Sequence, residues 1–256
     1  MTKRLQTRST QRREELKVFG LHASLALAQK RRADIIRVYL TPARKREFSE
    51  VLSWCAKEKK AYHLVEEEEL SKVSGTLHHE GVCILARRKF QPSFAELMEK
   101  FSGNNTPGCL IYLDGVENPH NLGAIIRSAA HFGAGGLLFD KKDKLSLSGA
   151  AYRVAQGGVE ALPVVAIDSP HKVFAHLKNL GFQIIATAPD NSEELSRVVL
   201  PKRVIFLLGS ESAGVAKDVM KLASKCICIP GSGAVQSLNV SAAAAVFLAE
   251  YRRQTI

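Results

Sequence analysis

The stretch CLIYLDGVENPHNLGAIIRSAAHFGAGG, residues 109–136, reads as a strand, a polar turn and a helix in direct succession. An apolar run over residues 110–113 meets the polar segment 114–121, and apolar residues then recur at helical spacing. This segment carries four polar side chains of interest: Asn118, His120, Asn121 and Arg127. Parallel sheets open ligand crevices beyond the carboxyl ends of their strands, so the turn is a candidate site. Capping by asparagine and solvation of a helical arginine would account for the same residues, and both alternatives stay open.

The sequence around this stretch, residues 109–256, alternates apolar strands with helices. We expect strands at 110–113, 136–139, 162–167, 183–188, 204–208 and 226–229. We expect a first helix that ends at 131 and later helices at 170–180, 215–222 and 238–252. Near-continuous Val, Ile and Leu strands separated by helices are typical of a parallel sheet covered on both faces. These residues are therefore expected to form one α/β domain.

The preceding residues divide into three parts. Residues 1–16 are basic and almost devoid of apolar side chains, so we expect a flexible arm. Residues 17–90 predict a small α/β domain with helices at 18–29, 48–59 and from 66, and strands at 32–42, 61–66 and 81–88. Residues 91–108 end in the turn-forming sequence SGNNTPG and are expected to link the two domains.

The positive charge is concentrated at the front of the chain. Residues 1–90 hold 20 Lys and Arg against 11 Asp and Glu, a balance of +9, whereas residues 91–256 hold 16 against 14, a balance of +2. This asymmetry favours a polyanionic partner, most simply a nucleic acid, although a basic tail that serves solubility is the alternative. Several basic residues near element ends suit a surface that grips phosphates: Lys30, Arg31, Arg32, Arg44, Lys45, Arg46, Lys57, Lys59 and Lys60.

Composition excludes several other classes of protein. The chain has 256 residues, of which 46% are hydrophobic and 24% charged, as in an ordinary globular protein. It has neither an apolar run of transmembrane length nor a secretory signal, so we expect no membrane association and a cytoplasmic location. The five cysteines lack CxxC spacing, and Cys226 and Cys228 alternate along an apolar strand, so core packing is favoured over a metal site.

Two later stretches join a strand to a glycine-rich turn. The first, RVIFLLGSESAGVAKDV over residues 203–219, resembles a phosphate loop, but Val215 and Ala216 stand where that loop needs Lys and Ser or Thr. The second, CICIPGSGAVQSLNVSAAAAVFLAEYRRQ over residues 226–254, places Gln236 where a GxGxxG fingerprint needs its third glycine. A nucleotide-binding dehydrogenase is therefore disfavoured. Ser and Asn before the final helix are also common as caps alone.

Taken together, three segments resemble the three ordered motifs of SpoU-type (TrmH-like) ribose 2′-O-methyltransferases of the SPOUT superfamily. They are NPHNLGAIIRSAAHFGA (118–134), LLGSESAG (207–214) and IPGSGAVQSLNVSAAAA (229–245). The segments VFGLHASLAL (18–27) and HHEGVCILA (78–86) resemble the two ends of the small substrate-binding domain that many of these enzymes carry.

The resemblance implies a fold and a set of site residues. It implies a deep trefoil knot over residues 204–248, S-adenosylmethionine bound by the knot loops, a homodimer, and no metal. It assigns catalytic roles to Asn121, Arg127, Glu211, Ser237 and Asn239, and contacts with the methyl donor to Thr187, Gly209, Gly214, Ile229 and Leu238. For Arg127 we favour binding of a phosphate or of the developing 2′-oxyanion because a guanidinium stays protonated, with a general-base role left open.

The function implied is S-adenosylmethionine-dependent methylation of a ribose 2′-hydroxyl in structured RNA. Only ribose carries that hydroxyl, which points to RNA over DNA. The front domain resembles that of the enzymes that act on rRNA, so rRNA is favoured over tRNA. The alternative from another class is a catalytically inactive RNA-binding or ribosome-assembly protein with the same fold.

Overall fold

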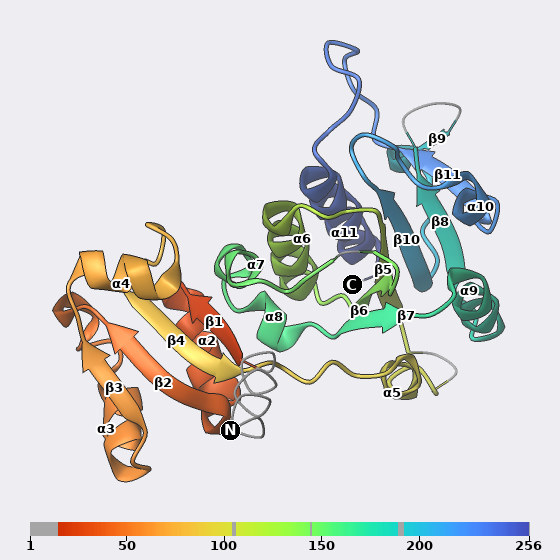
Figure 1. Cartoon of the computed structure of the whole chain (residues 1–256). Helices are drawn as coiled ribbons and strands as arrows, with labels where there is room; N and C mark the ends of the chain where they lie inside the picture. Colours follow the sequence, from red (N-terminus) through yellow and green to blue (C-terminus); the bar gives the residue numbers. More distant parts are fainter. Residues whose placement is uncertain (1–14, 104–105, 144, 189–191, 256) are drawn as a thin grey trace, which may run out of the picture. The chain divides into compact units, whose positions relative to one another are not determined.

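The computed structural model describes residues 15–103, 106–143, 145–188 and 192–255, so the expected basic arm lies almost entirely outside the described residues. The chain divides into two compact units. Unit 1 comprises Met1–Phe90 together with Leu147–Glu160, and unit 2 comprises Gln91–Ser146 together with Ala161–Ile256. Figure 1 shows the elements of both units in sequence colours.

A four-stranded sheet in the order β1-β4-β2-β3 forms the centre of unit 1. Strand β4 (Val82–Arg87) runs antiparallel to both β1 (Glu15–Phe19) and β2 (Ile35–Leu40), whereas the edge strand β3 (Ala61–Leu64) is parallel to β2. The part of this unit before residue 90 includes the helices α2 (Leu21–Lys30), α3 (Ser49–Lys57) and α4 (Glu67–Ser74), with 3-10 turns at Arg32–Asp34 and Pro42–Arg44.

The expected first helix at 18–29 is wrong at its start, because Val18 and Phe19 belong to β1. Leu16 and Val18 are buried while Lys17 is exposed, which is the alternation of a strand with one buried face. Gly20 then separates strand from helix at φ 95°, a conformation that suits glycine. A Cβ at Gly20 would also lie 2.8 Å from the side chain of Arg153.

Residues 147–160 join unit 1, although the sequence grouped them with residues 109–256. They form α7 (Gly149–Ala155) and begin α8 (Gly158–Ala161). The carboxylate of Glu160, with a side chain only 2% exposed, receives Arg31 Nε over 3.0 and 2.9 Å. Arg31 also donates to Asp34 and to the carbonyl of Arg87, so this guanidinium holds the unit together and is not free for phosphate.

Unit 2 contains a seven-stranded sheet in the order β7-β6-β5-β10-β8-β11-β9, with every pair parallel. The parallel α/β sheet expected from the sequence is confirmed. The strands are β5 (Gly108–Asp114), β6 (Gly136–Asp140), β7 (Val164–Ile167), β8 (Gln183–Thr187), β9 (Glu193–Glu194), β10 (Arg203–Gly209) and β11 (Lys225–Cys228). The two-residue β9 was not expected, since it has no apolar run to mark it.

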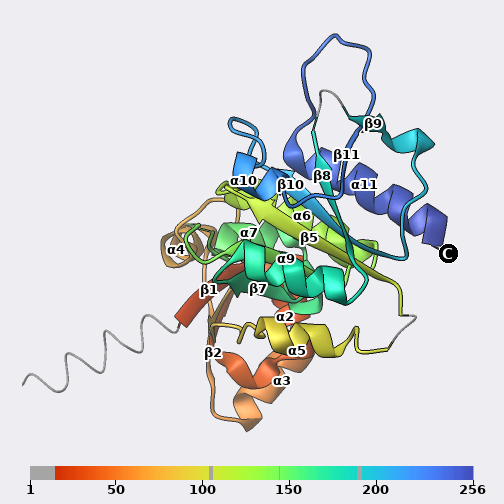
Figure 2. The same cartoon turned by 90° about the vertical axis from the view of Figure 1, so that its right-hand side faces the viewer.

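Helices cover both faces of this sheet. On one face, α9 (Pro170–Asn179) and the short α10 (Lys217–Met220) share a core cluster with the inward residues of β5, β8 and β10. On the other, α6 (Pro119–His131) and α11 (Val240–Thr255) run side by side, as Figures 1 and 2 both show. Phe247 of α11 stacks on Phe206 of β10 with ring centroids 5.4 Å apart. This placement sets the amino-terminal ends of α6 and α11 near the strand ends that carry polar residues.

The segment expected as a linker, residues 91–108, contributes to the core of unit 2. It contains α5 (Phe94–Glu99), which begins with a capping box formed by Ser93 and Glu96. Leu97, Met98 and Phe101 are buried among the core residues of unit 2. The pattern formed by these three apolar side chains is too short to distinguish a core helix from a surface turn in the sequence alone.

The trefoil knot implied for residues 204–248 stays a prediction. Over the described residues, no helix combines the length and the apolar character needed to span a bilayer.

Candidate functional site

A cavity of about 560 Å³ lies at the carboxyl ends of β8, β10 and β11 in unit 2. Its lining combines apolar and polar residues, as expected of a small-molecule site at strand ends in a parallel sheet. The lining residues are Thr187, Ala188, Leu208, Gly209, Ser210, Glu211, Gly214, Ile227, Cys228, Ile229, Gln236, Ser237, Leu238, Val240, Ala243 and Phe247.

The loop from Gly209 to Gly214 forms one side of the cavity by folding tightly back on itself. The backbone N–H of Gly214 donates to the carbonyl of Ser210 over 2.9 Å, and Ser210 N donates to the carbonyl of Asp114 over 3.0 Å. A Cβ at Gly209 would lie 2.0 Å from the carbonyl carbon of Gly214. Glycine at 209 is therefore required for the two ends of the loop to pack backbone against backbone.

The end of β5 holds the same loop in place from the other side. The Asp114 carboxylate accepts the backbone N–H of Ala216 over 2.7 Å, just beyond the loop. Nearby, burial is the main cause of a raised pKa at Asp143, and the charges of Asp114 and Asp140 act in the same direction. Hydrogen bonds thus join the end of β5 to the loop from Gly209 to Gly214 at one edge of the cavity.

Three polar side chains from three segments meet beside the cavity. Glu211 Oε1 accepts Asn121 Nδ2 over 3.0 Å and Asn239 Nδ2 over 2.6 Å. Asn239 Nδ2 also donates to Asn121 Oδ1 over 3.0 Å, which closes the triangle. Each of the three motif segments contributes one member, although 118 residues separate Asn121 from Asn239 in sequence.

Asn239 also lies immediately before α11 and caps its first turn. Its Oδ1 accepts the backbone N–H of Ser241 over 2.9 Å and the hydroxyl of Ser241 over 2.5 Å. Both N–H bonds and the carbonyl oxygen of this amide are therefore occupied, and the capping interpretation holds alongside the site interpretation. Asn239 acts by holding its neighbours in position.

The structure places the ten predicted site residues in three groups. All five predicted donor contacts line the cavity: Thr187, Gly209, Gly214, Ile229 and Leu238. Glu211 and Ser237 also line it, and Asn121 and Asn239 are bonded to Glu211. Arg127 makes no hydrogen bond to this group: it is exposed on α6, about 120° around the helix from Asn121. Among the described residues it has no hydrogen-bond or ion-pair partner.

Several residues of the site were missed by sequence reasoning. The apolar wall includes Leu208, Ile227, Val240 and Phe247, which carry no signal beyond ordinary core residues. Asp114 and Ser241 could have been found, because one is the last residue of a strand and the other follows Asn239 at capping distance.

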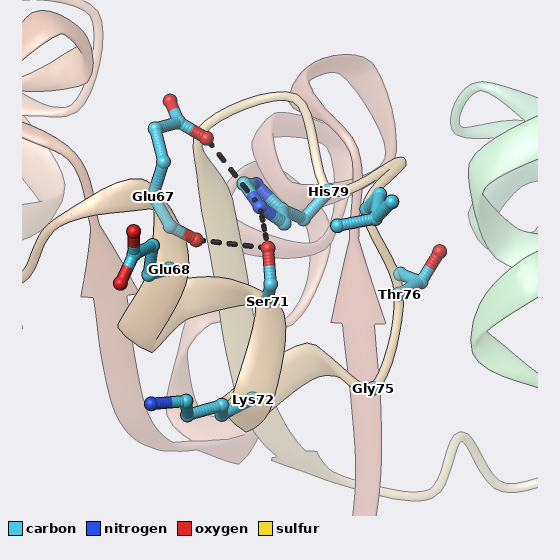
Figure 3. Close-up of a pocket in the computed structure, with 8 residues that line it drawn as sticks. Glu67, Glu68, Ser71, Lys72, Gly75, Thr76 and His79 are labelled. Carbon is cyan, nitrogen blue, oxygen red and sulfur yellow. Dashed lines mark hydrogen bonds and ion pairs between the residues drawn. The ribbon is translucent and has the colours of Figure 1, made fainter.

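Unit 1 contains a second cavity, of about 680 Å³, next to α4. Its lining combines opposite charges from Glu67, Glu68 and Lys72 with the exposed side chain of Leu77, and it also includes Ser71, Gly75, Thr76 and His79 (Figure 3). Ser71, His79 and Glu67 are the residue types of a hydrolytic triad, and the hydrogen bonds among them show whether they form one.

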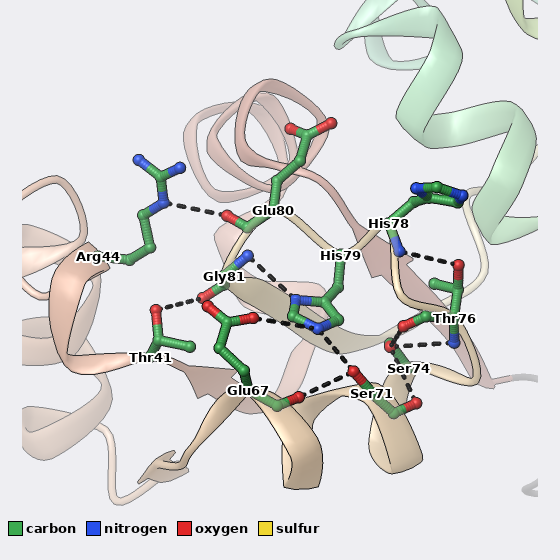
Figure 4. A network of polar contacts seen from close by, with 10 residues as sticks. All are labelled: Thr41, Arg44, Glu67, Ser71, Ser74, Thr76, His78, His79, Glu80 and Gly81. Atoms are coloured by element: carbon green, nitrogen blue, oxygen red, sulfur yellow. Dashed lines mark hydrogen bonds and ion pairs between the residues drawn. The ribbon is translucent and has the colours of Figure 1, made fainter.

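The geometry excludes a triad, because both partners reach the same ring nitrogen of His79 (Figure 4). Nε2 lies 3.0 Å from Ser71 Oγ and 3.4 Å from Glu67 Oε2, while Nδ1 accepts the backbone N–H of Gly81 over 3.1 Å. Ser71 donates its own hydrogen to the carbonyl of Glu67 over 2.8 Å, so it cannot be activated by the histidine. His79 braces the turn before β4.

Arg44 serves the same turn, since its Nε donates to the carbonyl of Glu80 over 3.0 Å and its Nη1 to Glu47 over 2.9 Å. Arg31 and Arg44 are thus structural members of the basic set expected to grip phosphates.

The family model described as the SpoU rRNA Methylase family matches residues 108–249, more than half of the chain. The chain belongs to this family. A second model, for the substrate-binding domain of RNA 2′-O ribose methyltransferases, matches residues 17–92 of this SpoU methylase. The expected family is confirmed.

Relatives and solved structures agree with this placement. The SpoU methylase chain is 36% identical over 247 residues to the Escherichia coli O157:H7 protein named uncharacterized tRNA/rRNA methyltransferase YfiF, covering 95% of the chain and 70% of that protein. It is 31% identical over 238 residues to the 23S rRNA (guanosine-2′-O-)-methyltransferase RlmB of Nitrosomonas europaea, covering 93% and 91%. An AdoMet-bound rRNA methyltransferase from Sinorhizobium meliloti has the same fold, with a TM-score of 0.77, 22% identity, and 98% and 91% coverage.

Proposed function

We propose that this chain transfers a methyl group from S-adenosylmethionine to a ribose 2′-hydroxyl of RNA, with rRNA favoured over tRNA. One observation carries the proposal: the cavity at the strand ends is adjacent to the bonded set Asn121, Glu211 and Asn239. The RlmB relative, named for guanosine 2′-O-methylation of 23S rRNA, supports rRNA as the substrate class.

The residues that line the cavity fit the methyl donor. Leu238 is 45% exposed although it lies on the cavity wall, so a ligand with an apolar surface would cover it. Next to it, the tight loop from Gly209 to Gly214 brings backbone groups to the cavity. An apolar wall for a purine and backbone groups for its polar edge are what an adenosyl ligand needs.

The bound donor supplies a methyl group on a sulfonium, which is already an excellent leaving group. The protein must therefore align the ribose oxygen and stabilise it as its proton departs. The paired amides on Glu211 fix the side chains of Asn121 and Asn239 before RNA arrives, and Ser237 adds a hydroxyl at the cavity wall. Glu211 is accordingly a positioning residue in this proposal.

Arg127 supplies the cation in this scheme. Its exposure on α6 suits contact with a large ligand, and a permanently protonated guanidinium suits a phosphate or a developing oxyanion. We further propose that the chain acts as a cytoplasmic homodimer, and that unit 1 holds the RNA. The +9 balance over residues 1–90 supports that last assignment.

The first test is calorimetric titration of the purified protein with S-adenosylmethionine. We expect saturable binding of one donor per subunit, and we expect Leu238→Arg to abolish it because the new cation fills the cavity. Absence of binding at millimolar donor, with RNA present as well as absent, would contradict the proposal and favour an inactive RNA-binding protein.

The second test separates the role of Arg127 from donor binding. Arg127→Ala is expected to abolish methyl transfer, measured by mapping 2′-O-methylation in a deletion strain that carries the variant, while the calorimetric affinity for the donor stays near the wild-type value. Normal methylation in that strain would remove Arg127 from the mechanism.

A further inference from the structure

Over the described residues of unit 1, one face of the sheet is only partly covered. The strand registers place eight side chains on this face next to the small core under α4, and we call them the open face: Glu15, Lys17, Arg37, Tyr39, Ala61, His63, Leu85 and Arg87. The opposite face is a closed core, where Val18, Val38 and Ile84 have no exposed surface. The open face therefore presents cations and aromatic rings on one side of the sheet, opposite a closed core.

Two rings of the open face are already stacked. Tyr39 and His63 lie side by side on β2 and β3, with ring centroids 5.1 Å apart and an angle of 18° between their planes. β3 is the edge strand, so no described strand lies beyond His63, and the side chain of His63 is exposed. Tyr39 is half-buried and packs on the small core beneath α4, which gives the stack a rigid base.

Three exposed cations share the face with this stack: Lys17, Arg37 and Arg87. Arg37 Nη1 donates to the Tyr39 hydroxyl over 3.0 Å, which places a guanidinium beside the rings and leaves most of its N–H donors free. Glu15 lies opposite Arg87 and is the one acid in this register. The acidic run Glu66–Glu69 follows the other end of β3, so it would direct a phosphate chain toward Arg37 and Lys17.

We propose that the open face is a stacking platform for an unpaired nucleotide of single-stranded RNA, with a base on the outer face of His63 and its phosphates near Arg37 and Lys17. Exposed aromatic rings interleaved with cations are the combination that single strands require, because every base has a π face and every nucleotide a charge. This inference rests on the proposed function, since it says how unit 1 contacts the RNA.

The test uses the full chain and a fluorescein-labelled oligouridylate of about 12 nucleotides, followed by fluorescence anisotropy. We expect His63→Ala to weaken binding about tenfold, and His63→Phe to retain it, because the loss of stacking and not of a hydrogen bond is responsible. Arg37→Gln should lower the slope of log affinity against log salt by about 0.7, the value for one phosphate contact in a single strand.

Tyr62→Ala is the matched control. Tyr62 is a neighbouring aromatic residue on the same edge strand, 42% exposed, but the register with Val38 places it on the opposite face. We expect wild-type affinity for this variant. Equal losses in the Tyr62 and His63 variants, or no loss at His63, would overturn the inference, and so would failure of the wild type to bind the oligouridylate.

The same preparations are titrated with S-adenosylmethionine. Normal donor binding together with an unchanged His63→Ala affinity for RNA refutes the platform alone, whereas absence of donor binding, both with and without RNA, refutes the proposed function. Preferential binding of an acidic peptide over the oligouridylate would assign the open face to a protein partner and also overturn the inference.

Discussion

Replacement of Gly209 by alanine tests whether the cavity depends on backbone-to-backbone packing of the glycine-rich loop. The new Cβ would lie 2.0 Å from Gly214 C and 2.2 Å from Val215 N. Ordinary contact begins near 3.4 Å, so one end of the loop must move by about 1.4 Å. All the close atoms belong to the backbone, so no side chain can rotate out of the way.

The size of the effect follows from the cost of that movement. Overpacking that displaces a backbone costs about 1–3 kcal/mol. If the variant relaxes by moving the loop, binding must restore the original geometry at that cost, and the dissociation constant for S-adenosylmethionine should rise about 5- to 150-fold. Calorimetry measures the affinity, and thermal unfolding measures the stability of the same variants.

Two other glycines near the cavity calibrate the result. Gly214 has φ +67° and no atom near its Cβ position, so Gly214→Ala should cost only the strain of a left-handed residue, about 1–2 kcal/mol. Gly231 has no close atom and no positive φ, and Gly231→Ala should stay within about 0.5 kcal/mol of wild type. Wild-type donor affinity in Gly209→Ala would refute the reasoning, as would equal effects in all three variants.

Three further outcomes are expected. Glu160→Ala should destabilise the protein by about 3 kcal/mol in urea unfolding, because it leaves the half-buried Arg31 cation without its main partner. As a control, removal of the exposed Asp168 carboxylate beside Lys141 should change stability by less than about 0.5 kcal/mol. Similar losses of stability in both variants would contradict this prediction. Cys228 lines the cavity, so S-adenosylmethionine should protect it from alkylation by iodoacetamide, as measured by mass spectrometry. The buried thiols of Cys55 and Cys109, whose pKa values burial raises, should stay unmodified with and without donor. Alkylation of Cys228 at the same rate with and without donor would argue against the cavity as the donor site. Burial raises the pKa of Cys83 to about 11 from 9.0, so the contribution of its neutral thiol to folding stability is complete below pH 9 and is lost as pH rises toward 11. The free energy of unfolding should therefore fall more between about pH 8 and about pH 10.5 in wild type than in Cys83→Ala. Equal falls in the two proteins would refute this role of Cys83.

The strands and helices of unit 2 could be predicted because each buried strand is a continuous apolar run and each long helix has a clear period. The prediction failed where that signal is weak. β1 was merged with α2 because Val18 and Phe19 also fit a helical period, and only pairing with β4 decides between the two. α7 was not expected because its sequence, GAAYRVA, has few large apolar side chains.

The site shows the same division. Motif resemblance alone was enough to name Asn121, Glu211 and Asn239, because short sequence motifs can be recognised without knowledge of the fold. Their hydrogen bonds could not be predicted, because each joins residues that only the sheet order β5-β10-β8-β11 brings together.

The amino-acid sequence by itself determined the α/β class, the basic front of the chain and the positions of the motif residues, because these depend on composition and local periodicity. Only the tertiary structure decided that Gly209 packs on Gly214, that Arg31 forms an ion pair with Glu160, and that Tyr39 and His63 stack on the open face. Packing distances, ion pairs and strand register arise between segments distant in sequence, where local pattern carries no information.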